Sequence, residues 1–173
     1  LTIGDAVKGV IAKRAFYFNT SLTTVVIGDG ITSIGEEAFS NSNNIKTVII
    51  GNGVTEIAKE AFAYCNKLES VTIGENLQTI GGRAFYYSSL KDVVLPASLK
   101  TVATDIFDRC DSFKSLTVNS QEALDTILGS LKTFMKKAKV LKVKEGLTVD
   151  EAKLDEVGAA KIGTENGFVI YSR

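Results

Sequence analysis

The chain has 173 residues, of which 45% are apolar, and it carries 20 Lys and Arg against 20 Asp and Glu, with no His. This length and apolar fraction are typical of one globular domain, and zero formal net charge disfavours a protein that binds the nucleic-acid backbone. Because His is the usual general base and the commonest metal ligand, its absence favours a binding or structural protein that is not an enzyme and holds no cofactor.

An internal repeat begins near the start of the chain and is marked by phenylalanine. Its spacing is 23, 23, 23 and then 22 residues, at Phe16, Phe39, Phe62, Phe85 and Phe107. The residue five positions before each of these is also apolar: Ile11, Ile34, Ile57, Ile80 and Val102. Several sets of equivalent positions, called columns here, keep this register over about five units. One unit of 23 residues is too small to form a stable core by itself. The sequence therefore predicts a solenoid of stacked repeats.

Each unit contains one short β-branched segment that we expect to be a strand. These segments are TVVI, TVII, SVTI, DVVL and SLTV, and their alternation predicts strands stacked into a parallel ladder. Each strand runs into a turn such as Gly28–Gly30, whose third residue suits a positive φ. We expect Gly35–Phe39 to form a short helical or irregular turn on the opposite, convex side. In the fourth unit the pattern shortens, because Leu90 arrives one residue early.

The outward residues of this ladder are the candidate binding surface, called here the recognition stripe. It has two columns: Thr24, Thr47, Ser70, Asp92 and Ser115, and Val26, Ile49, Thr72, Val94 and Thr117. Apolar side chains in water, flanked by hydroxyl groups, can form a ligand-binding surface. The alternative is that Thr, Val and Ile stand there only because they favour strands. A competing aromatic patch is formed by Tyr17, Phe18, Tyr64, Tyr86 and Tyr87.

After the repeats, helical periodicity replaces the 23-residue period. From Ser120 to Ala138 one face is apolar, which predicts a helix that caps the last repeat, with Asn119 and Glu122 as its start signal. Residues 140–143 are expected to return to the ladder as a strand. Thr148 and Glu151 suggest a capping box for a weak helix to about residue 160, and residues 168–171 a final strand. The expected fold is an α/β solenoid with a parallel β ladder, comprising repeats at residues 1–118 and a C-terminal cap at 119–173.

Two motifs suggest catalysis or phosphate binding but have simpler explanations. Gly30 and Gly35 have the spacing of a phosphate-binding loop, yet Glu36 stands where such a loop needs Lys, and both glycines fit the repeat. Glu36 and Glu37 form a carboxylate pair without a converging partner acid or base. We therefore interpret them as solvated surface charges, and we expect no catalytic, cofactor-binding or metal-binding residues.

The cysteines and a lysine-rich segment are also interpreted structurally. Cys65 and Cys110 lie two repeats apart, which is about 9–10 Å at the usual strand spacing and beyond the ~7 Å limit for a disulfide. We expect both to be small buried thiols. The lysines could attract an anionic partner, although solvation of the cap explains them as well; they are Lys132, Lys136, Lys137, Lys139, Lys142 and Lys144.

Two of the units, IGEEAFSNSNNIKTVIIG from Ile34 and IAKEAFAYCNKLESVTIG from Ile57, resemble the BspA-like leucine-rich repeats of bacterial and protozoal surface proteins. The resemblance covers residue 1 to about residue 118. It departs from the family at the end of the strand, where Gly28 and its equivalents replace a proline that only Pro96 retains. The resemblance implies a leucine-rich-repeat solenoid and transfers no catalytic residue.

The resemblance also implies a function class and a location. It indicates a secreted or cell-surface adhesion module whose rigid face binds a host or matrix protein, or a glycan. The alternative is a structural spacer or assembly segment of a larger surface protein. No apolar run approaches the roughly 20 residues of a membrane helix, so we expect no membrane insertion. From the zero net charge we expect no nucleic-acid partner. Since the chain opens at Leu1 without Met or a leader pattern, we expect a mature or excised fragment.

Overall fold

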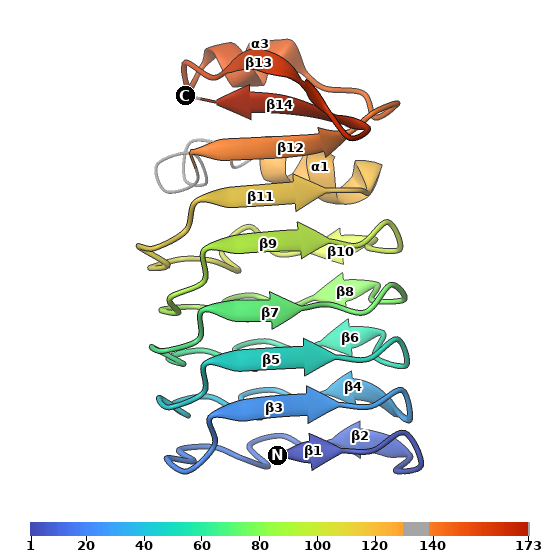
Figure 1. The fold of residues 1–173 in the computed structure, drawn as a ribbon, viewed down its shortest axis with the longest axis vertical. Coiled ribbons are helices and arrows are strands. Elements are labelled where there is room, and N and C mark those ends of the chain that lie inside the picture. The colour runs from blue at the N-terminus through green and yellow to red at the C-terminus, as the bar shows by residue number, and fades with distance from the viewer. Residues whose placement is uncertain (130–138, 173) are drawn as a thin grey trace.

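The computed structural model describes residues 1–129 and 139–172, and its repeats stack along one long axis from the N-terminus to the C-terminus (Figure 1). One side carries parallel strands, one from each repeat. They are β1 (Thr2–Ile3), β3 (Thr24–Ile27), β5 (Thr47–Ile50), β7 (Ser70–Thr72), β9 (Asp92–Leu95) and β11 (Ser115–Val118). Equivalent residues lie side by side, as in the row Val25–Val48–Val71. The predicted parallel ladder is therefore confirmed.

A second parallel sheet, which the sequence analysis did not predict, lies behind the first. Its strands are β2 (Gly9–Ile11), β4 (Ile31–Ile34), β6 (Glu56–Ile57), β8 (Thr79–Ile80) and β10 (Thr101–Val102). In β4, Ile31 and Ile34 are buried while Thr32 is exposed. These strands are too short to show a clear alternation, so the sequence pattern gives only their buried columns.

The convex turns form a third row of backbone contacts between repeats. In the second repeat Glu37, Phe39 and Asn41 donate their N–H groups to carbonyl oxygens of the third repeat at 2.8–3.1 Å. The residues between them bond within the turn instead, as Ala38 does to the oxygen of Gly35. Alternate N–H groups thus bond to the next repeat and within the turn. This alternation requires left-handed backbone, with φ of 54° at Glu37 and 61° at Asn41. The expected helical or irregular turn is thus an ordered, hydrogen-bonded row.

The turn glycines are needed for close packing and not for positive φ, which corrects the sequence interpretation. Neither Gly30 nor Gly53 is among the glycines with positive φ. A Cβ at Gly30 would overlap the carbonyl oxygen of Val7, and one at Gly53 that of Asp29. Each turn therefore lies directly against the turn of the preceding repeat, where no side chain fits.

The phenylalanine column forms one stacked row inside the solenoid. Successive rings from Phe16 to Phe107 lie 4.9, 5.0, 5.6 and 5.9 Å apart between centroids and are nearly parallel. Phe39, Phe62 and Phe85 are fully buried. The predicted phenylalanine column is therefore a continuous row in the core.

The front ladder is interrupted between β7 and β9. Strands β1, β3, β5 and β7 form one sheet, and β9 and β11 belong to another, although the back sheet continues from β8 to β10. Figure 1 shows β7 and β9 farther apart than the other front neighbours. Val71 and Ile73, beside this break, are only partly buried, whereas Val25 and Ile27 are buried. We call this break the seam.

The C-terminal region completes the upper front sheet. Strand β12 (Val140–Lys144) pairs in parallel with β11, so β11, α1 (Gln121–Gly129) and β12 form the expected crossover. Strand β14 (Phe168–Ser172) confirms the predicted last strand and pairs antiparallel with β12. Its other neighbour, β13 (Ala160–Glu165), was not predicted. The predicted helix at 120–138 is confirmed for α1, and its remainder lies outside the described residues.

Both predicted capping signals are wrong in detail. Ser120, not Asn119, accepts a hydrogen bond from the N–H of Ala123 at 3.3 Å, while Asn119 donates to the carbonyl oxygen of Leu95 at 2.8 Å. The weak helix is α3 (Glu151–Asp155), which ends before residue 160 and has no side-chain cap. Thr148 instead bonds through its backbone to the side chain of Gln121.

Candidate functional site

The recognition stripe lies on the outer surface of the front strands. Val26, Ile49 and Thr72 are direct neighbours across β3, β5 and β7, and Val94 and Thr117 are neighbours across β9 and β11. Ile49 is 41% exposed and Val94 56% exposed, while the inward residues beside them on the same strands are buried. The outward columns thus place apolar groups in water on a sheet fixed by backbone hydrogen bonds.

The polar column runs parallel to this apolar one. Thr24, Thr47 and Ser70 are neighbours in the lower sheet, and Asp92 and Ser115 in the upper sheet. The hydroxyl group of Ser115 donates to the carboxylate of Asp92 at 2.5 Å, which fixes both side chains. The stripe therefore offers hydroxyl and carboxylate groups on one side and methyl groups on the other.

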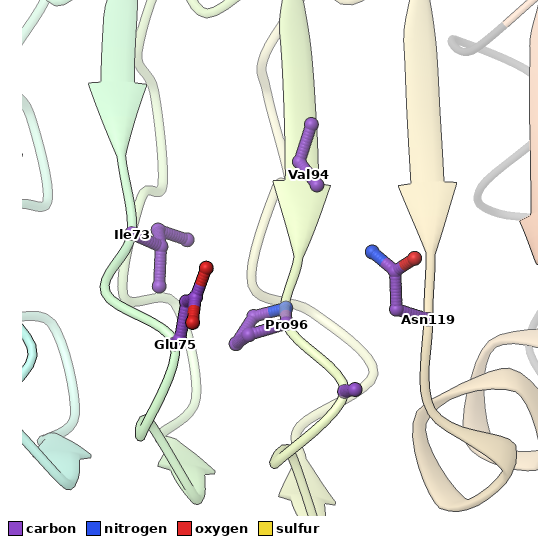
Figure 2. Close-up of a pocket in the computed structure, with 6 residues that line it drawn as sticks. Ile73, Glu75, Val94, Pro96 and Asn119 are labelled. Atoms are coloured by element: carbon purple, nitrogen blue, oxygen red, sulfur yellow. The ribbon is translucent and has the colours of Figure 1, made fainter.

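The seam divides the stripe, and a groove of about 420 Å³ opens there. Ile73 and Glu75 lie on one side of Pro96 and Asn119 lies on the other, with Val94 on the strand above Pro96 (Figure 2). Proline has no N–H group, so Pro96 cannot donate the hydrogen bond that Gly51, two repeats earlier in the same column, donates to the carbonyl oxygen of Ile27 at 2.8 Å. Of the residues that line this groove, only Val94 was predicted from the sequence to bind a ligand.

The aromatic residues form two separate groups and not one patch. Tyr17 contacts Phe18 at 5.1 Å between ring centroids. Tyr64, Tyr86 and Tyr87 contact one another at 5.1–6.2 Å. Asn41 occupies the position between Phe18 and Tyr64 in their shared column, which interrupts the aromatic surface.

The carboxylates that could have suggested acid–base catalysis are held in ion pairs between repeats. Glu36 lies 2.9 Å from Lys13, and Glu37 accepts two hydrogen bonds from Arg14 at 2.8 and 3.1 Å. Hydrogen bonding to Arg14 lowers the pKa of Glu37, which keeps it ionised. Residues 31–34, between the two glycines of the phosphate-loop spacing, form strand β4. Among the described residues no group of three or more His, Cys, Asp or Glu could hold a metal ion.

Both cysteines are buried thiols, as expected. The thiol of Cys65 donates to the carbonyl oxygen of Phe39 at 3.3 Å, and that of Cys110 to Phe85 at 3.1 Å. The hydroxyl of Ser42, in the same column, makes the equivalent bond to Phe16 at 2.8 Å. Burial raises the pKa of Cys65 to about 12, so its thiol stays protonated and unreactive at neutral pH.

The lysine-rich segment is only partly described. Lys132, Lys136 and Lys137 lie outside the described residues. Lys139 and Lys142 line a hollow that also contains Asp92 and Asp111. Charges of both signs meet there, and an anionic partner for this segment stays a prediction. No helix in the part of the chain that the structure describes has the length and hydropathy of a membrane span.

Comparisons with known proteins identify the repeat. A family model described as "BspA type Leucine rich repeat region" matches residues 2–127 with six copies. The comparison with curated proteins gives no match. Among solved structures, a leucine-rich repeat protein of T. pallidum is similar with a TM-score of 0.63 and 28% identity, over 67% of this chain and 57% of that one.

Two Bacteroides proteins give further structural matches. A leucine-rich repeat protein from Bacteroides ovatus has a TM-score of 0.58 and 19% identity, over 86% of this chain and 43% of that one. A leucine-rich repeat protein from Bacteroides capillosus has a TM-score of 0.51 and 30% identity, over 57% of this chain and 78% of that one. The chain therefore spans about half the length of the T. pallidum and B. ovatus proteins.

Proposed function

Because the chain belongs to the BspA-type leucine-rich repeat family, we propose that it is a non-catalytic interaction module of a secreted or cell-surface protein, which binds a host or matrix protein through the recognition stripe. The fold supports this proposal, since backbone hydrogen bonds between front strands hold each part of the stripe rigid, and the back sheet and the convex turns remain hydrogen-bonded across the seam. A rigid surface loses little conformational freedom when a partner binds.

The exposure of Ile49 and Val94 is the observation that carries this proposal. Each projects from the centre of a strand, next to outward hydroxyl-bearing residues such as Thr47 and Thr117. Full burial of an exposed side chain of this size is worth about 1.5–3 kcal/mol, and because Ile49 and Val94 are 41% and 56% exposed, covering the remainder contributes roughly half of that, about 1 kcal/mol each. Two such side chains, one on each side of the seam, give a partner two apolar anchors.

The area of the stripe limits the kind of complex. The five front strands of the stripe, about 4.8 Å apart and each about four residues long at ~3.3 Å per residue, give a surface of roughly 24 by 13 Å, or about 300 Å². Stable interfaces bury about 800 Å² on each partner. A partner must therefore also contact the loops at the strand ends, or else bind transiently.

The test uses Ile49→Asp and Val94→Asp, with Thr101→Asp on the exposed side of β10 as the matched control. Binding of the purified chain to a panel of purified matrix proteins is measured by surface plasmon resonance. We expect Ile49→Asp and Val94→Asp to abolish binding to whichever matrix protein the wild-type chain binds, while their Tm stays within a few degrees of the wild-type value. The Thr101→Asp control should bind as the wild type does. Normal binding by both front variants would exclude this surface.

A structural spacer or assembly segment is the second candidate function. It is favoured by the fact that the chain spans only 57% and 43% of two solved proteins with the same fold. In that case the isolated chain would bind nothing in the panel, while a parent protein containing further segments would bind.

A further inference from the structure

The shortened fourth repeat produces a small hollow, called here the notch. Two residues separate Cys65 from Leu68 and Cys110 from Phe113, but only Ser89 separates Ser88 from Leu90. The short loop thus lies between two longer ones. A hollow of about 140 Å³ opens over it, lined by Asn66, Tyr87, Ser88, Ser89, Arg109, Asp111 and Ser112.

Hydrogen bonds hold the floor and one wall of the notch in place. The hydroxyl of Ser89 donates to the carbonyl oxygen of Asn66 at 2.6 Å. The side-chain amide of Asn66 is oriented so that its nitrogen faces two acceptors. It donates to the carbonyl oxygens of Tyr64 and Tyr87, at 3.0 and 3.2 Å. The side-chain oxygen of Asn66 is then the atom of the amide that remains to accept a bond from a ligand.

Tyr87 and the tyrosine rings that contact it border the notch. Tyr87 lines it and is 47% exposed. Tyr64, 40% exposed, lies 6.0 Å from Tyr87 at an angle of 35°. Tyr86 lies 5.1 Å from Tyr64, and the guanidinium of Arg83 covers its ring at 5.5 Å. The rings of Tyr64 and Tyr87 therefore form a fixed, partly exposed platform beside the polar hollow.

From this arrangement we propose that the notch binds one pyranose ring of a neutral glycan, with the next sugar stacked on Tyr87 and Tyr64. A sugar ring has an apolar face of C–H groups, which packs on an aromatic ring, and an edge of hydroxyl groups, which bond to amide, hydroxyl, guanidinium and carboxylate groups. The notch supplies both. Its volume is well below the roughly 300–1,000 Å³ of sites for drug-sized ligands, which fits one ring and not a longer segment.

The charge of the lining favours a neutral ligand. Arg109 and Asp111 contribute opposite formal charges, so the seven lining residues carry no net formal charge. An anionic sugar would gain from Arg109 and be repelled by Asp111. The assignment does not depend on the recognition stripe, because none of its ten residues lines the notch.

The experiment is saturation-transfer difference NMR on the full chain with maltopentaose, cellopentaose and mannopentaose, and with trigalacturonate as the anionic comparison. We expect transfer to at least one neutral oligosaccharide. Tyr87→Asn should weaken its binding about tenfold, which corresponds to about 1.4 kcal/mol for one aromatic contact. Asn is chosen because Asn41 occupies the same column with a similar φ of 61°.

Two further variants make the test specific. Phe18→Asn is the matched control, since Phe18 shares the column and a positive φ of 57° but lies away from the notch; it should bind as the wild type does. An Asn inserted between Ser89 and Leu90 restores the longer loop and should abolish binding while circular dichroism shows an unchanged fold. The proposal is overturned if no neutral oligosaccharide binds at about 10 mM, if only trigalacturonate binds, or if Tyr87→Asn binds normally. Ile49→Asp should leave glycan binding unchanged, which separates failure here from failure of the proposed protein partner.

Discussion

Phe62→Ala tests the stacked phenylalanine row on which the solenoid depends. Phe62 is fully buried in the middle of the row, with Phe39 at 5.0 Å and Phe85 at 5.6 Å between centroids. Emptying a buried aromatic site costs about 3–5 kcal/mol, from lost burial and from the cavity left behind. Two stacked neighbours place the expected loss toward the upper end of that range.

The measurement is urea denaturation followed by circular dichroism, supported by thermal unfolding. For a chain of this size a loss of 3–5 kcal/mol lowers the Tm by about 6–20 °C. Phe16→Ala is the matched control, because Phe16 is half-buried and stacks on Phe39 alone among the rings of the row. We expect it to cost less than half as much. A loss below about 1 kcal/mol for Phe62→Ala would show that the row is not the core.

Two other predictions concern packing and thiol chemistry. Gly53→Ala should destabilise the chain by about 1–3 kcal/mol, because its Cβ would overlap the preceding turn, whereas Gly4→Ala, with nothing within 4 Å, should be nearly neutral; equal urea midpoints would contradict this. In a Cys110→Ser background, Cys65 should react with an aromatic disulfide reagent at pH 8 only after unfolding, since burial raises its pKa from 9.0 to about 12. The contribution of the protonated Cys65 thiol to the free energy of unfolding is therefore complete below about pH 9 and is lost as the pH rises toward about 12. Rapid labelling of Cys65 in the native chain would disprove the burial of this thiol.

The sequence predicted the buried columns of the fold better than its backbone. Phe39 and Ile34 were assigned to the apolar columns of the repeat from spacing alone, and both are fully buried. The second sheet was missed because its strands, such as Glu56–Ile57, are too short for an alternating pattern. The left-handed turns were missed because residues such as Glu37 do not signal positive φ; hydrogen bonds to the next repeat impose it.

The candidate site was predictable only where it follows the repeat. The outward position of Ile49 follows from strand alternation, so the sequence could place it. The groove beside Ile73 and the notch at Ser89 arise from an irregularity in the repeat, and alternation carries no information about that. The available signal was the early Leu90, which marks the one loop that is shorter than its neighbours on both sides.

The one residue missing from the loop of the fourth repeat accounts for both the seam and the notch. The convex row and the back sheet pass through the fourth repeat without a break, as the bonds from Tyr64 to Tyr86 and from Lys100 to Gln78 show. The shortened loop that leads from the convex turn to β9 has one residue less to reach the front sheet. Strand β9 is therefore displaced from β7, and the two strands do not pair. Pro96 then prevents the last bond from forming even if the strands approach. The Asn insertion should therefore narrow the seam as well as fill the notch, and stronger protection of the Val94 amide from hydrogen exchange would show it.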